Sequence, residues 1–183
     1  MSKKTLLNLG LTGPISCGKG TAAEYLEKKY KFKSIKMSDF LRALARKEKV
    51  PPTRPNLENL QKKYPFGYIA DRAVQKARDY NKKGFSVVVD GIRRPNQATA
   101  IKRGLKAKLI LIGADQKVRF ERAKRRRRKG FETTLKTFKT MEEKENKFFN
   151  MKKTFSMADY KVDNSKDKKP LQKQLDALIK KLR

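Results

Sequence analysis

The feature that most constrains the fold is a glycine-rich turn near the start of the chain, Gly13 to Thr21, which reads Gly-Pro-Ile-Ser-Cys-Gly-Lys-Gly-Thr. It follows an apolar run from Leu6 to Leu11 and leads into a helical pattern over residues 21–30. A strand, a glycine loop and a helix in this order surround an anion with backbone N–H groups, beside the positive end of the helix. The sequence therefore predicts that this loop binds the phosphates of a nucleotide.

All residues of the loop are candidate ligands of that nucleotide: Gly13, Pro14, Ile15, Ser16, Cys17, Gly18, Lys19, Gly20 and Thr21. Lys19 can reach terminal phosphate oxygens, and the Thr21 hydroxyl can lie near the phosphates and a metal ion. A plain glycine turn beside a surface lysine is the alternative interpretation. The strand before the turn and the helix after it favour the phosphate site.

The charge balance is strongly basic, with 49 Lys and Arg against 18 Asp and Glu in 183 residues and a net charge of +31. The lysines are spread along the chain, which is typical of a solvated surface, but attraction to a polyanion such as RNA stays open. Arginine is concentrated in one segment, at positions 119, 122 and 125–128.

The composition excludes several classes of protein. A single cysteine, Cys17, allows no internal disulfide and suggests a reducing, cytoplasmic compartment. With one cysteine and no histidine, a zinc site is not expected. No apolar run is long enough to span a membrane. The basic start followed by Thr5 to Leu11 resembles a signal peptide, but it leads directly into the glycine loop, so we expect no targeting segment.

Strand and helix patterns alternate along the chain. Strands are expected at residues 6–11, 32–37, 85–89, 107–113 and 159–163, and helices at 21–30, 40–46, 68–81, 96–103, 115–128 and 171–182. This alternation predicts a single α/β domain over residues 1–183, with a five-stranded parallel sheet between two helical layers.

The segments between these elements also carry capping and turn signals. Ser38-Asp39 is expected to cap the helix of residues 40–46, the Pro-rich residues 50–55 to be extended, and Asn56 to cap a short helix ending at Gln61. Tyr64 to Gly67 reads as a turn. Residues 130–157 are polar with irregularly spaced phenylalanines, for which core packing is favoured over stacking on bases.

Polar groups follow the predicted strands at their carboxyl ends. They are the glycine loop, Ser38-Asp39, the segment Asp90-Gly-Ile-Arg93 and the turn at Asp115. Because ligands of parallel sheets bind beyond the carboxyl ends of the strands, we expect one cleft to collect these groups.

With these motifs, the chain resembles the P-loop nucleoside monophosphate kinases, and within them the dephospho-CoA kinases and phage deoxynucleoside monophosphate kinases. The likeness lies in the Gly-Lys-Gly-Thr form of the loop, in Ser38-Asp39-Phe-Leu-Arg42, in Asp90 to Arg93 and in Ala158 to Asn164. One departure is the very basic lid segment, followed by Phe138 to Glu145 where relatives carry aspartate and arginine.

The resemblance implies a kinase that uses ATP and Mg²⁺ and acts on small-molecule nucleotides. It implies acceptor-binding helices over about residues 38–80 and a lid over about residues 119–150. Implied catalytic residues are Lys19, Asp90, Arg93, Arg122 and Arg126, with Arg125 as an alternative to Arg126. Implied acceptor ligands are Ser38, Asp39, Arg42, Arg54 and Arg93. Asn164 would lie against the adenine, and Thr21 with Asp90 would hold the metal through water.

Three functions remain open from the sequence. The first is transfer of the γ-phosphoryl group of ATP to a small acceptor. We favour a (deoxy)nucleoside monophosphate over the ribose 3′-hydroxyl of dephospho-CoA, because Arg42 and Arg93 suit an acceptor phosphate. The second is an RNA-binding or ribosome-associated P-loop protein, suggested by the charge. The third is a nucleotide-dependent switch without transfer chemistry.

Overall fold

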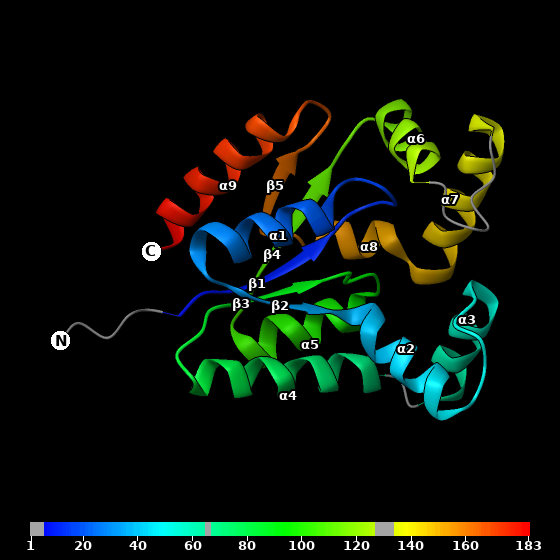
Figure 1. Cartoon of the computed structure of the whole chain (residues 1–183), viewed down its shortest axis with the longest axis horizontal. Helices are drawn as coiled ribbons and strands as arrows, with labels where there is room; N and C mark the ends of the chain where they lie inside the picture. Colours follow the sequence, from blue (N-terminus) through cyan, green and yellow to red (C-terminus); the bar gives the residue numbers. More distant parts are fainter. Residues whose placement is uncertain (1–5, 65–66, 127–133) are drawn as a thin grey trace.

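The computed structural model of the chain describes residues 6–64, 67–126 and 134–183. Its centre is a five-stranded, all-parallel sheet in the order β2-β3-β1-β4-β5 (Figure 1). The strands are β1 (Asn8–Thr12), β2 (Lys33–Lys36), β3 (Val87–Asp90), β4 (Lys108–Gly113) and β5 (Tyr160–Asp163). The predicted sheet and three-layer α/β architecture are confirmed.

Helices cover both faces of the sheet. Helices α1 (Lys19–Tyr30) and α9 (Lys168–Leu182) lie on one face, and α4 (Tyr68–Lys82) and α5 (Pro95–Leu105) lie on the other (Figure 1). Strand β3 shows why both faces need cover: Val88 packs toward α1 and α9, while Val87 and Val89 pack toward α4 and α5. A β-branched run buried on both faces is typical of parallel sheets.

Two helix pairs lie at the same end of the molecule, on the right in Figure 1, where the strands end. One pair is α2 (Met37–Lys47) with α3 (Arg54–Lys63), and the other is α6 (Gln116–Arg125) with α7 (Leu135–Phe149). A short helix, α8 (Met151–Ser156), connects α7 to β5. This arrangement leaves the carboxyl ends of the strands between the two pairs.

The starts of α2 and α3 differ from the predictions in a way that changes the roles of named residues. Helix α2 begins at Met37, so Ser38 and Asp39 lie in its first turn and are not its caps. Helix α3 begins at Arg54 after Thr53, whereas the sequence suggested an extended segment as far as Pro55. Proline is compatible with the first turn of a helix, because the N–H group that it lacks has no partner there in any case.

The polar segment after the arginine cluster forms helices that the sequence analysis did not assign. Phe138 and Phe149 on α7 are 1% and 3% exposed. The Phe138 ring lies 5.7 Å from that of Phe120, in an edge-to-face arrangement. Core packing is therefore the role of these two rings. Phe131 lies outside the described residues, as do Arg127 and Arg128 of the cluster.

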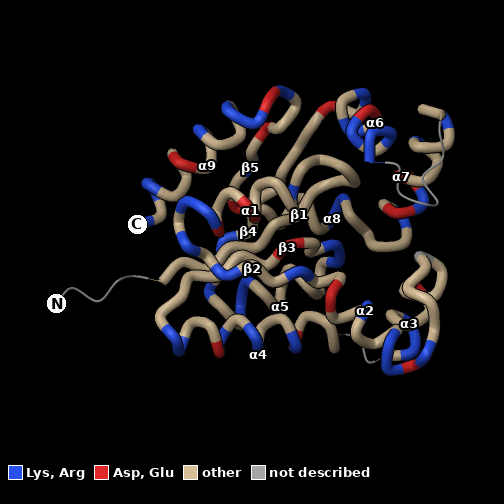
Figure 2. The backbone as a smooth tube through the Cα atoms, in the orientation of Figure 1, with Lys and Arg blue, Asp and Glu red and all other residues tan. Residues whose placement is uncertain are grey.

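Lysine and arginine are distributed over most of the helices (Figure 2). Within the described residues, no helix combines the length and the apolar character needed to cross a membrane.

Candidate nucleotide and acceptor site

The loop between β1 and α1 is tightly fixed by its neighbours. Gly13 has a φ of 148°, and a Cβ at this position would come within 2.2 Å of the Ile112 carbonyl oxygen. Gly18 has a φ of 100°, and a Cβ there would come within 2.1 Å of Asn164 Nδ2. Both glycines are thus required by conformation and by space. At Gly20 the space for a Cβ is open, so contacts within the protein do not explain that glycine.

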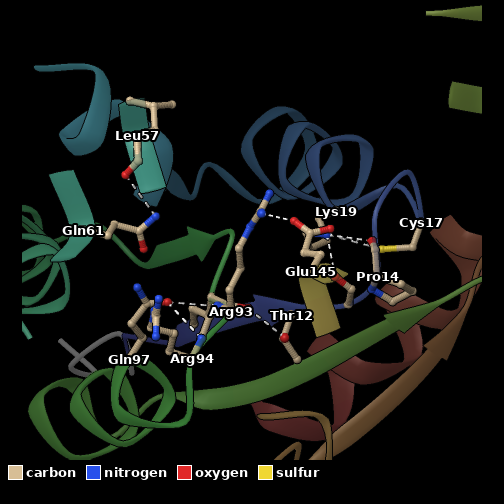
Figure 3. A network of polar contacts seen from close by, with 12 residues as sticks. Thr12, Pro14, Cys17, Lys19, Leu57, Gln61, Arg93, Arg94, Gln97 and Glu145 are labelled. Carbon is tan, nitrogen blue, oxygen red and sulfur yellow. Dashed lines mark hydrogen bonds and ion pairs between the residues drawn. The ribbon is translucent and has the colours of Figure 1, made fainter. Parts of the chain in front are cut away.

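Lys19, the first residue of α1, folds back over the loop. Its Nζ donates to the carbonyl oxygens of Gly13 at 2.8 Å and Pro14 at 3.0 Å, and it lies 3.6 Å from Cys17 Sγ (Figure 3). Carbonyl oxygens are weaker partners for an ammonium group than phosphate oxygens are. The lysine is therefore held beside the place where the loop amides would bind phosphate.

The loop after β5 closes one side of this half of the site. Asn164 Nδ2 donates to the Cys17 carbonyl at 2.8 Å, which ties the two loops together. Arg122 on α6 donates to the carbonyl oxygens of Asn164 at 2.7 Å and Lys166 at 2.9 Å. Burial lowers the pKa of the Arg122 guanidinium. Arg122 thus fixes the Asn164 loop in this structure.

A cavity of about 370 Å³ opens beside the glycine loop and under α6. Arginine and lysine dominate its lining, and Asp167 is the acidic residue among them. The lining residues are Gly18, Thr21, Arg122, Arg125, Arg126, Asn164, Lys166, Asp167 and Lys168. Its charge and its position beside the loop suit an anionic nucleotide. Arg125 and Arg126 are exposed, and both line this cavity.

Asp90, the last residue of β3, has an unusual environment. Its Oδ1 is buried and has no hydrogen-bond partner among the described residues. Burial raises the pKa of this carboxyl group, while the positive charges of Lys19, Lys36 and Arg93 act in the opposite direction. A buried oxygen without a partner among the described residues, under the charge of the loop lysine, Lys19, fits a group that binds metal-coordinated water.

The described residues contain no cluster of three or more His, Cys, Asp or Glu that could hold a metal by itself. Mg²⁺ needs no such cluster, because it keeps several waters and is held by one or two protein oxygens together with substrate phosphates. A magnesium site of this kind would need no protein ligands beyond the two predicted from the sequence, Thr21 and Asp90.

Arg93 joins the segment after β3 to helix α7. Its Nη1 donates to Glu145 Oε1 (Figure 3), and its guanidinium lies 5.2 Å from the centre of the Phe149 ring. Its backbone N–H donates to Gln97 Oε1 at 3.0 Å, and its carbonyl accepts from Thr154 Oγ1 at 2.8 Å. Glu145 was not among the site residues predicted from the sequence. Only the tertiary contact reveals it.

The remaining predicted acceptor ligands lie on α2 and α3. Arg42 Nη1 donates to Ser38 Oγ and to Asp39 Oδ1, each at 3.0 Å, so the three residues form one polar cluster. The Arg42 and Asp39 side chains are 49% and 63% exposed, which leaves them open to a ligand. Arg54 is the first residue of α3, and its side chain lies outside the described part of the structure.

A second cavity, of about 330 Å³, lies among α2, α3, α4 and α5. Leu41, Leu44, Leu60, Tyr64 and Tyr68 contribute apolar walls. Its polar lining includes Gln61, Arg94, Asn96 and Gln97, and Asn96 Oδ1 is buried without a partner among the described residues. Arg94, Asn96 and Gln97 were not among the site residues predicted from the sequence. Their position directly after Arg93 was the available signal.

Arg119, from the basic cluster, is buried and fully engaged. It donates to Glu142 through Nη1 and, at 3.1 Å, through Nη2. It also donates to the carbonyl oxygens of Ala114 at 2.9 Å and Ile15 at 3.3 Å. This residue therefore links α6 and α7 to the glycine loop.

The fold and the loop define a P-loop kinase-like protein. A family model described as "AAA domain" matches residues 12–139. The structure is similar to that of shikimate kinase from Bacteroides thetaiotaomicron, with a TM-score of 0.64 and 14% identity over 97% of this chain and 99% of that chain. A likeness at this identity shows the fold alone.

Sequence relatives give the family. A UPF0200 protein of Methanococcus maripaludis is 30% identical over 179 residues, which cover 95% of this chain and 96% of the relative. A UPF0200 protein of Pyrococcus horikoshii is 28% identical over 179 residues, or 94% and 95% of the two chains. The chain belongs to the UPF0200 family.

Proposed function

We propose that this protein is a kinase that transfers the γ-phosphoryl group of ATP to a small phosphorylated acceptor, a (deoxy)nucleoside monophosphate. The observation that carries the proposal is the environment of Asp90. Its buried carboxyl oxygen, which has no hydrogen-bond partner among the described residues, feels the charges of both the loop lysine, Lys19, and the acceptor-side arginine, Arg93. A donor phosphate and an acceptor phosphate would therefore lie on either side of one carboxylate.

On the donor side, the amides of Gly13 to Thr21 and the Lys19 ammonium would bind the ATP phosphates, and Asn164 would contact the adenine. Thr21 and Asp90 would hold Mg²⁺ through its waters. When bound, the metal neutralises phosphate charge and orients the triphosphate. Arg122 and Arg126 of the lid would act on the transferring group, with Arg122 releasing its present carbonyl partners.

On the acceptor side, Arg93, Arg42 and Arg54 would bind the monophosphate, with Ser38 and Asp39 supporting Arg42. An acceptor phosphate oxygen forms the new P–O bond as the bond to the β–γ bridging oxygen breaks, and ADP leaves. No proton transfer is needed for a dianionic acceptor, so catalysis rests on alignment and charge neutralisation. This chemistry requires ATP and Mg²⁺, and the proposal includes a cytoplasmic location.

The cavity among α2 to α5 supports a nucleoside as the acceptor. A base has apolar faces and polar edges, and the cavity combines leucine and tyrosine walls with the amides of Asn96 and Gln97. The apolar walls would contact the faces of the ring, and the amides would contact its edge.

Transfer to the 3′-hydroxyl of dephospho-CoA is the second candidate, and Asp90 favours it. A hydroxyl acceptor must lose its proton, and a carboxyl group with a raised pKa is a better base than an ordinary aspartate. RNA binding rests on the net charge and on the basic run of residues 124–129 in the sequence, and it gains no support from the fold or the relatives.

A coupled assay of ADP release tests the proposal. The purified protein is given ATP, Mg²⁺ and, in turn, each ribo- and deoxyribonucleoside monophosphate or dephospho-CoA. We expect turnover with one or a few of the monophosphates. Turnover with dephospho-CoA alone would show that the acceptor is dephospho-CoA and not a nucleoside monophosphate. Tight ATP binding without turnover on any acceptor would contradict the proposal that the protein is a kinase.

A further inference from the structure

We propose that Glu145 is the positioning residue of the acceptor site. Its carboxylate holds the Arg93 guanidinium by one edge, so that the other edge faces the acceptor anion. This inference rests on the proposed function, because it takes Arg93 as an acceptor ligand.

The burial of the two partners is unequal. The Glu145 side chain is 6% exposed, whereas that of Arg93 is 41% exposed. A carboxylate removed from water is costly unless a cation pairs with it, and Arg93 provides that cation. The glutamate is therefore fixed in the protein, and the arginine reaches from it toward solvent.

Two side chains of α7 grip Arg93 together. Glu145 and Phe149 are four residues apart and lie on the same face of the helix. The first binds Nη1, and the second lies under the guanidinium, 5.2 Å from its carbon. The backbone of Arg93 is held as well, through Gln97 and Thr154. Few rotamers of Arg93 satisfy all these contacts, so its orientation is set before a ligand arrives.

A comparison with the buried Arg119–Glu142 pair, which joins α6 to α7, shows that the contact with Glu145 leaves hydrogen-bond donors of Arg93 unused. Arg119 donates through both Nη1 and Nη2 to Glu142 and through Nε to a carbonyl, so each of its three guanidinium nitrogens makes a hydrogen bond. Arg93 gives Nη1 to Glu145, and its Nε and Nη2 make no hydrogen bond to a described residue. A guanidinium carries five N–H donors in one plane, so the open edge of Arg93 can bind phosphate oxygens.

The first test needs no substrate. In ligand-free protein with ¹⁵N-labelled arginine, we expect a resolved, slowly rotating Nη signal for Arg93, assigned by its loss in Arg93→Lys. Glu145→Gln should collapse this signal, and Glu143→Gln, an exposed glutamate on the same helix, should leave it unchanged. An unchanged signal in Glu145→Gln would overturn the proposal even if the protein were not a kinase.

The second test uses the best monophosphate from the ADP-release assay. We expect Glu145→Gln to raise the KM for that monophosphate about tenfold, as loss of one charge-assisted contact predicts, without changing the KM for ATP. The KM of Glu145→Asp for the monophosphate should fall between those of the wild type and Glu145→Gln. This variant replaces Glu145→Gln in the test if the glutamine variant does not fold. A lower melting temperature with unchanged kinetics would show a purely structural role and overturn the proposal. Absence of turnover in the wild type would instead contradict the proposed function.

Discussion

The proposed donor and acceptor halves of the site are built in different ways. The donor half is a continuous loop, Gly13 to Thr21, whose lysine binds carbonyl oxygens of the same loop. The acceptor half is assembled from segments far apart in the chain. Its central arginine, Arg93, is fixed by Glu145, which lies 52 positions away. A local motif can be recognised from sequence, but an assembled site depends on how the helices pack.

The largest effect is expected from the donor half. Lys19→Ala should lower kcat by about 10²–10³-fold, because it removes a positive charge aimed at the transferring phosphoryl group. The measurement is single-turnover ADP formation at saturating ATP. Lys28→Ala, an exposed lysine on the same helix, is the matched control and should retain full activity. A Lys19 variant that retains wild-type turnover would contradict a role of Lys19 in phosphoryl transfer.

Asp90→Asn should change activity and stability in opposite directions, with a lower kcat and a higher melting temperature. We expect kcat to fall about 100-fold, since the carboxylate charge between the two halves is lost. Burial raises the pKa of Asp90, so ionisation of this group opposes folding. The variant should therefore melt at a higher temperature than wild type at neutral pH. A lower melting temperature together with full activity would contradict both roles.

The pH dependence of this stability difference follows from the same carboxyl group. Below its ordinary pKa of 3.8, Asp90 is protonated in both the folded and the unfolded chain and contributes no difference. Above that value the unfolded chain loses the proton first, so the wild type loses stability until the pH passes the raised pKa of the folded state. Melting temperatures from pH 3 to 8 should show the wild type and Asp90→Asn diverging over this window. Parallel curves would show that Asp90 is not buried as described.

The two glutamates of α7 test whether the halves are supported separately. Glu142→Gln should destabilise the protein by about 3 kcal/mol, because it leaves the buried Arg119 without its carboxylate. Since Arg119 contacts the Ile15 carbonyl, we expect the KM for ATP to rise and the KM for the acceptor to stay unchanged. Glu145→Gln should show the reverse pattern. Denaturant unfolding and the two KM values measure the difference, and identical patterns in both variants would contradict it.

A smaller effect is expected at the exposed cluster on α2. Arg42→Ala should raise the KM for the acceptor about threefold, because interactions of solvent-exposed charges are screened. Arg46→Ala, an exposed arginine one turn further along α2, is the control and should not change this KM. If Arg42→Ala instead raises the KM for ATP, the proposal that this cluster binds the acceptor is contradicted.

The smallest effect concerns RNA. The positive charges are spread over most helices (Figure 2), so we expect negligible affinity for RNA near physiological salt. A filter-binding titration at two salt concentrations measures this. Tight binding that persists at the higher salt would reinstate the RNA hypothesis and give the basic surface a function of its own.

Prediction from sequence succeeded where the signal was local. The apolar run of residues 85–89 predicted the strand that forms β3, and the glycine loop predicted a helix after it, which α1 confirms from two residues earlier than expected. Helix starts were less predictable. Proline at position 55 suggested an extended segment, but it occupies the first turn of α3, where its missing N–H has no consequence.

The sequence by itself determined the sheet, its two helical layers and the place of the glycine loop between β1 and α1, because these depend on periodicity and on glycines at fixed spacing. Tertiary structure decided which charges meet. Glu142 and Glu145 read as parts of a polar segment, yet folding buries both, one against Arg119 and the other against Arg93. Pairing of buried charges depends on distances between helices, and no local pattern in the chain encodes those distances.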